Sequence, residues 1–182
     1  MTPTHSPGRL AVPSPPTVLD AFNIAPADEL LPLLLDCLRS LRWAERVTAH
    51  RPYPTADALL AASDEAAYDL TPSDLSEALA GETLPALPDG AHSAAHMAMD
   101  AAHAAYEARF GHAFVICLDA LPPSEALDHV LEGIRSRLTN DPEEERVVAA
   151  EELRRLARQR LMTSLRGAGN RATSHREPAP GT

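Results

Sequence analysis

The chain has 182 residues, of which 45% are hydrophobic and 23% charged, and its formal net charge is −10 at pH 7. This composition is typical of a globular protein long enough to bury a core, and its acidity argues against nucleic acid as a partner. All 16 positive residues are Arg, which excludes Schiff-base chemistry and a P-loop lysine. No apolar run approaches the roughly 20 residues that span a bilayer, and residues 1–16 lack the pattern of a secretory signal. We therefore expect a cytoplasmic protein with no membrane partner.

Ala and Leu supply most of the apolar residues, whereas Val, Ile, Thr and aromatic residues are few, and this balance favours helices over sheet. The sequence predicts an all-α fold, a single-domain helical bundle of six to eight helices. The domain is expected over residues 18–166, between disordered tails at 1–17 and 167–182 that are rich in Pro, Ser and Gly. Cys37 and Cys117 each lie in an apolar pattern, so we expect buried free thiols.

The first expected helix covers residues 28–50, where Leu recurs at spacings of three and four, and it ends before Pro52 and Pro54. The other helices follow from the same periodicity and from cap residues. They are expected at 55–68 with Thr55 as N-cap, at 71–80 with Ser73 as N-cap, at 91–109, at 124–138 with Ser124 as N-cap, and at 143–165. Residues 82–90 are expected to form a loop.

The densest patch of large side chains extends from Tyr106 to Cys117. It predicts the end of a helix at Gly111, because Gly accepts the left-handed conformation that closes a helix. The apolar run at 114–117 that follows is too short to be a helix of its own. We expect this run in the middle of the core, with any cavity of the fold beside it.

Three histidines, His92, His96 and His103, recur at spacings of four and seven and therefore share one face of a helix. Asp100 and Glu107 continue that face. It is interpretable as a solvated polar face, as a catalytic pocket or as half of a metal site, and a zinc site would need convergent third and fourth ligands. We predict no metal ion and no cofactor.

Several strings, taken together, resemble one family. They are Ala21-Phe-Asn-Ile24, Cys37 with Arg42-Trp-Ala-Glu-Arg-Val47, Tyr106-Glu-x-Arg-Phe-Gly-His-x-Phe-Val-Ile-Cys117, Ile134-Arg-x-Arg-Leu-x-Asn140, the acidic helix start at Glu143 to Glu145, and Glu151 and Glu152 followed by Arg160-Leu161. Over roughly residues 19–162 the chain resembles the 2-oxo-4-hydroxy-4-carboxy-5-ureidoimidazoline (OHCU) decarboxylases of the ureide pathway.

The resemblance implies an all-α fold, often a homodimer, that uses neither cofactor nor metal. It implies loss of carbon dioxide from OHCU, the product of uricase and the following hydrolase, to give (S)-allantoin. In the family a His-Pro pair supplies the catalytic histidine and a Ser-x-x-Glu-Gln motif supplies the acid. An Arg of the Arg-Leu-x-Asn string and backbone amides of the Phe-x-Ile string hold the substrate.

The chain departs from this pattern at the acid and the base. Glu82 stands in the position of the family's histidine, and His96 stands in the Glu position of Ser-x-x-Glu-Gln. Imidazole titrates near neutral pH unaided, so an exchanged pair could still supply acid–base catalysis if the two side chains meet. The resemblance thus implies His96 and Glu82 as catalytic residues and, as substrate-binding residues, Ser93, Arg137, Phe114, Val115 and Ile116.

Two functions follow from this interpretation. The first is an OHCU decarboxylase-like carboxy-lyase of the urate-to-(S)-allantoin pathway, acting on a small anionic ureide, with a possible homodimer as its assembly. The alternative is a catalytically altered or inactive paralogue that binds small anions or other proteins, since a fold does not fix a function.

Overall fold

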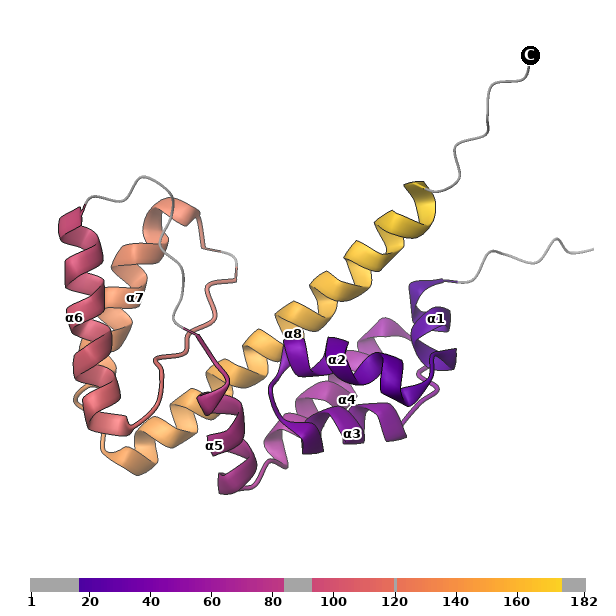
Figure 1. Ribbon diagram of the computed structural model, residues 1–182, viewed down its shortest axis with the longest axis horizontal. Helices are drawn as coiled ribbons and strands as arrows, with labels where there is room; N and C mark the ends of the chain where they lie inside the picture. The colour runs from indigo at the N-terminus through magenta and orange to yellow at the C-terminus, as the bar shows by residue number, and fades with distance from the viewer. Residues whose placement is uncertain (1–16, 84–92, 120, 175–182) are drawn as a thin grey trace, which may run out of the picture.

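The computed structural model describes residues 17–83, 93–119 and 121–174, and every regular element in these ranges is an α-helix (Figure 1). The helices are α1 (Val18–Ile24), α2 (Ala27–Cys37), α3 (Leu41–Ala49), α4 (Ala56–Tyr68), α5 (Pro72–Ala80), α6 (Ser93–Phe110), α7 (Pro123–Arg137) and α8 (Pro142–Ser174). The described part of the chain therefore confirms the all-α fold and the expected number of helices. In these ranges, no helix has the length and apolar character needed to cross a bilayer.

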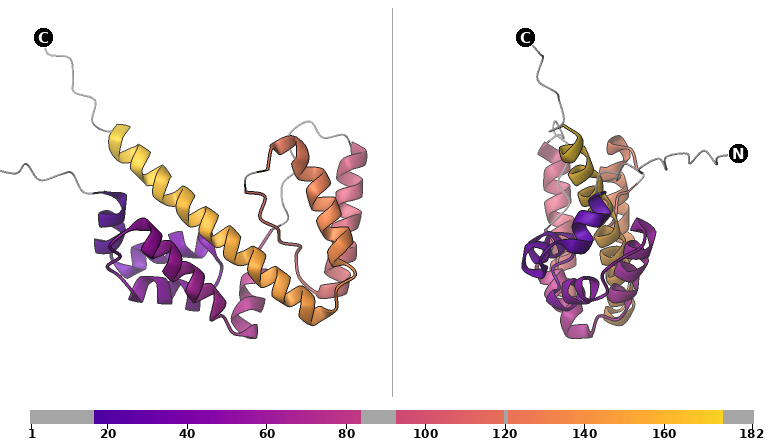
Figure 2. Two further views of the ribbon diagram at one scale, coloured as in Figure 1. Left: turned by 180° about the vertical axis from the view of Figure 1, so that it is seen from behind. Right: turned by 90° about the vertical axis from the view of Figure 1, so that its right-hand side faces the viewer.

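The long helix α8 is the element against which most of the others pack (Figures 1 and 2). Its residues Ala149, Leu153, Ala157 and Leu161 are at most 1% exposed and lie on one face, because they recur every four residues. Small and large side chains alternate along this face. They pack in the same core as residues of α2 and α4, the helices with the most extensive contacts to α8.

The buried side chains of the described residues form two cores. The larger lies between α1–α5 and α8 and contains the fully buried Trp43, whose indole N–H donates to the carbonyl of Ser63 at 3.0 Å. The smaller lies between α6, α7 and the run at 114–118, and Figure 1 shows the α6–α7 pair set apart from α1–α4. The run lies at the boundary between the cores: Phe114 belongs to the smaller core and Val115 to the larger.

The single helix expected at 28–50 is wrong, because the chain breaks at Leu38 to form α2 and α3. Leu38 has extended backbone angles, and Ser40 caps α3 by accepting from the N–H of Trp43. Apolar residues continue across the break, so helical periodicity alone did not locate it. α1 was also missed, and Thr17 caps it in a reciprocal capping box with Asp20.

Of the expected N-caps, Thr55 is confirmed, whereas Ser73 and Ser124 are wrong. α5 and α7 both begin at a Pro, which is favoured as the first helical residue and moves the cap to the residue before it. α8 is also longer than expected, since residues 167–174 of the expected C-terminal tail are helical. The remainder of both expected tails, most of the 82–90 loop and His92 lie outside the described residues.

The cap of α5 gives a direct test of this correction. The hydroxyl of Thr71 accepts from the N–H of Asp74 at 3.3 Å, and the carboxylate of Asp74 accepts from the N–H of Thr71 at 2.9 Å. We expect Thr71→Ala to lower the free energy of unfolding by about 1 kcal/mol, as N-cap deletions do. Ser73→Ala, two residues away and exposed, is the matched control and should change it by less than about 0.5 kcal/mol in urea titrations. A larger loss from Ser73→Ala than from Thr71→Ala would contradict the assigned cap.

Candidate active site

Arg160 of α8 binds both the last residue of α2 and a residue that closely follows α5. Its Nη1 donates to the carbonyl of Cys37 at 3.1 Å and to Glu82 Oε1 at 2.8 Å, and its Nη2 donates to Glu82 Oε2 at 2.8 Å. The side chain of Glu82 is 4% exposed and that of Arg160 is 35% exposed. The hydrogen bonds and the charge of Glu82 raise the pKa of Arg160, although burial opposes this effect. The pair is thus a buried carboxylate held by a guanidinium that reaches solvent.

Gly81 allows the chain to deliver Glu82 to this position. A Cβ at Gly81 would lie 2.3 Å from Cδ and 2.8 Å from Cβ of Arg39, which is closer than side chains tolerate. The end of α5 therefore packs directly against the connection between α2 and α3. A larger residue at position 81 would therefore require the Arg39 side chain or the end of α5 to shift.

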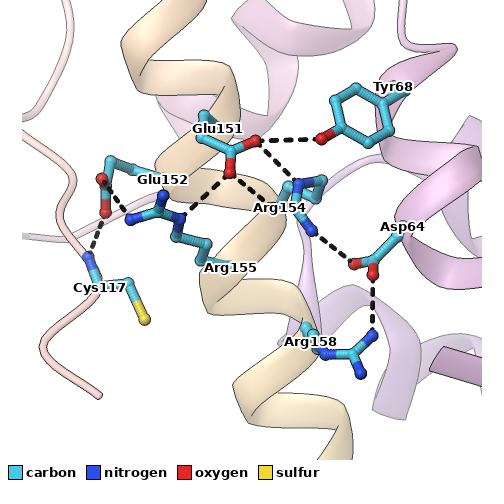
Figure 3. Close-up of polar contacts among 8 residues, drawn as sticks. All are labelled: Asp64, Tyr68, Cys117, Glu151, Glu152, Arg154, Arg155 and Arg158. Carbon is cyan, nitrogen blue, oxygen red and sulfur yellow. Dashed lines mark hydrogen bonds and ion pairs between the residues drawn. The ribbon is translucent and has the colours of Figure 1, made fainter. Parts of the chain in front are cut away.

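The run at 114–117 is held along one side by α7 and α8. The carbonyl of Val115 accepts from Arg137 Nη1 at 2.7 Å. The N–H of Cys117 donates to Glu152 Oε2 at 2.7 Å (Figure 3). Alternating residues of an extended segment present their backbone groups to opposite sides. The backbone groups of Phe114 and Ile116 therefore face the other side, where they form no hydrogen bond with other described residues. The run is thus fixed along the side that faces α7 and α8.

Arg137 was expected to bind substrate, but in this structure its side chain binds other groups of the protein. It is 8% exposed, and its Nε and Nη2 donate to Glu145 Oε1 at 2.9 and 2.5 Å, while Nη1 holds the carbonyl of Val115. The Tyr106 hydroxyl also donates to Glu145, and Asn140 Nδ2 donates to Glu145 Oε2 at 2.9 Å. All three guanidine nitrogens of Arg137 thus bind protein groups. We assign Arg137 to positioning the run at 114–117.

Glu145 and Tyr106 complete this buried cluster, and the sequence did not single out either as part of it. Glu145 belongs to the acidic helix start at Glu143 to Glu145, and it is fully buried. Burial and the hydrogen bond to Glu145 raise the pKa of Tyr106, so its hydroxyl stays protonated and remains a donor. The Arg137 guanidinium also lies over the Phe114 ring, 4.5 Å from its centroid.

The structure separates the other residues expected in the site. Both oxygens of Glu82 accept hydrogen bonds from Arg160. His96 lies on an exposed part of α6, whose first turn is remote from α5 in Figure 1. Ser93 begins α6, and its side chain is outside the described part of the structure. His103 is buried rather than solvated, with its ring 6.3 Å from that of Phe114.

No group of three or more potential metal ligands comes together within the ranges that the structure describes. Asp100 and Glu107 are exposed on α6, while His103 turns inward from them. The expected shared face of these residues is therefore divided between solvent and core.

A separate open cleft of about 510 Å³ lies between α8, α4 and Cys117. Its walls include three Arg side chains, but carboxylates neutralise them (Figure 3). Asp64 binds Arg154 at 3.1 Å and Arg158 at 2.8 Å, and Glu151 binds Arg154 at 2.5 Å and Arg155 at 3.1 Å. Arg154, its strongest partner, lowers the pKa of Glu151 to about 2. This balance of charges gives the cleft no surplus of positive charge for an anion.

Comparisons with known proteins agree with the fold. The structure is similar to the crystal structure of (S)-allantoin synthase (TM-score 0.62, 22% identity), covering 81% of this chain and 53% of that one. It is also similar to OHCU decarboxylase crystallised with (S)-allantoin (TM-score 0.64, 19% identity), covering 76% of this chain and 98% of that one. The chain thus spans about half the length of the (S)-allantoin synthase chain. No curated protein sequence matches it.

These similarities define the class as an all-helical domain with the OHCU decarboxylase fold. The sequence itself matches the family model described as OHCU decarboxylase over residues 23–83 and 85–162. The chain belongs to the OHCU decarboxylase family, as its motifs indicated.

The buried cluster predicts that replacing either of two nearby arginines will lower the free energy of unfolding by very different amounts. Arg137→Met leaves Glu145 charged and buried without its guanidinium, so we expect a loss of about 3–5 kcal/mol in the free energy of unfolding. Arg135→Met removes an exposed pair with Glu132 on the same helix and should cost less than about 1 kcal/mol. Urea unfolding of both variants measures this, and near-equal stabilities would contradict a structural role for Arg137.

His103 predicts a pH dependence of stability. Burial lowers its pKa in the folded protein, so the unfolded chain takes up a proton first as the pH falls below about 6.5. The contribution of His103 to stability is therefore complete above that pH and decreases below it. We expect the loss of stability between pH 7.5 and 5.5 to be smaller in His103→Asn than in the wild type. Parallel unfolding curves for the two proteins across this range would contradict the prediction.

Proposed function

We propose that the protein is a cofactor-free carboxy-lyase that converts OHCU into (S)-allantoin. The observation that supports this most strongly is the family match, which extends over residues 23–83 and 85–162 and includes the run at 114–117. The partly exposed guanidinium of Arg160 and the backbone groups of Phe114 and Ile116, which form no backbone hydrogen bond with other described residues, add the polar groups that an anionic ureide needs.

The reaction breaks the bond between a ring carbon and the carboxylate carbon. Carbon dioxide leaves, the bonding electron pair is delocalised into the neighbouring C=N bond, and the ureido-bearing carbon then takes a proton. In our proposal the backbone groups of Phe114 and Ile116 bind the ureide and orient it, so that the proton arrives on one face. Arg160 supplies the positive charge that faces the substrate carboxylate.

His96 is the proposed proton donor, and Ser93 a proposed substrate contact. Their support is their place in the acid motif of the family, at the start of α6. A positioned acid of this kind contributes on the order of 10² to 10⁴-fold to a rate. We also propose that the protein is cytoplasmic, because free thiols at Cys37 and Cys117 suit a reducing compartment, and that it forms a homodimer, as the resemblance implies.

One observation favours the alternative, a paralogue that binds small ligands without turnover. Glu82 stands where the family has its histidine, and its carboxylate already occupies the guanidinium of Arg160. In that case the site would keep its shape but would not catalyse the decarboxylation.

The two functions differ in a single assay. OHCU is generated in place from urate with uricase and the hydrolase, and the circular dichroism of (S)-allantoin is followed after the protein is added. We expect the chiral signal to rise well above the rate of spontaneous decay, and His96→Ala to remove about 10² to 10⁴-fold of that rate. His129→Ala, an exposed histidine on α7, is the matched control and should keep full activity.

A chiral signal no faster than spontaneous decay would refute the lyase and leave the paralogue. Full activity in His96→Ala would keep the lyase but overturn its proton donor.

A further inference from the structure

The contact between Glu82 and Arg160 has the geometry of a bound ligand. Two parallel N–H···O bonds of 2.8 Å join the Nη1 and Nη2 nitrogens to the two carboxylate oxygens. This is how guanidinium groups recognise free carboxylates. Because the Glu82 side chain is only 4% exposed, solvent screens the pair weakly.

The guanidinium keeps one edge available. Nη1 is used twice, by Glu82 and by the carbonyl of Cys37, whereas Arg160 Nε forms no hydrogen bond with other described residues. A second carboxylate can approach the Nε–Nη2 edge only beside the negative charge of Glu82.

We propose that Glu82 is an internal carboxylate ligand of Arg160 that sets the selectivity of the site, weakening carboxylate ligands relative to neutral ureides of the same shape. This rests on the proposed function in one respect, the assignment of Arg160 as the cation that faces the substrate carboxylate. One unit of like charge a few Å away, at an intermediate dielectric, weakens binding by about tenfold or more.

The test compares two probes that differ only in charge, ureidoacetate and its neutral amide, ureidoacetamide. Their dissociation constants are measured by calorimetry for the wild type and for E82Q at pH 7.5 and low salt. We expect E82Q to bind ureidoacetate at least about tenfold more tightly than the wild type, with ureidoacetamide changed by less than about twofold.

The matched control is E151Q, because Glu151 is another carboxylate paired with an Arg, on α8 and outside this site. It removes the same charge and should leave both affinities unchanged. The double variant E82Q/R160Q should lose the gain in ureidoacetate affinity. If E82Q does not fold, as judged by circular dichroism, E82A is used in its place with the same expectation.

Equal or weaker binding of ureidoacetate by the Glu82 variant, including no detectable binding by either protein, overturns the proposal. A gain of equal size for both probes, or in E151Q, does so as well. Binding requires no turnover, so the outcomes separate: turnover of OHCU without the affinity gain keeps the lyase and removes the role of Glu82. The affinity gain without turnover of OHCU would keep the role of Glu82 and remove the lyase.

Discussion

The buried ion pair between Arg137 and Glu145 is the interaction on which the geometry of the site depends. Two charges removed from water are stable only when hydrogen bonds satisfy their remaining donors and acceptors. Here the carbonyl of Val115, the hydroxyl of Tyr106 and the amide of Asn140 do so. The pair therefore joins α6, α7 and α8 to the run at 114–117, and these contacts fix the position of the run.

α8 extends this constraint from the smaller core to the larger. Glu145, Glu152 and Gln159 recur every seven residues, so they lie along one face about two turns apart. Glu145 closes the buried cluster, Glu152 accepts from the N–H of Cys117, and Gln159 lies 3.6 Å from its sulfur. Arg160 follows directly. The continuous helix α8 thus fixes the distance between the run at 114–117 and the guanidinium of Arg160.

The sequence predicted what local rules determine and missed what tertiary contacts determine. Helical periodicity located most helices, but it did not show the break at Leu38, because both sides of the break bury leucines. The family motif identified Arg137 but did not indicate where its side chain points. Only the structure shows that the side chain is turned into the core. Arg160 was part of a family string, but the sequence assigned no role to its side chain. Its partner Glu82 is 78 residues away, a distance at which spacing contains no signal.

The arginines of α8 differ in how their charges are neutralised, and family membership alone does not predict this difference. Arg154 and Arg158 share Asp64 and line a cleft with balanced charges, whereas Arg160 has a single carboxylate partner and a free edge. A neutralised cation attracts a second carboxylate far less than an unpaired one does, because the first carboxylate repels it at close range. With the same helices and the same buried cluster, the side chain at position 82 therefore changes the charge that a second carboxylate meets beside Arg160.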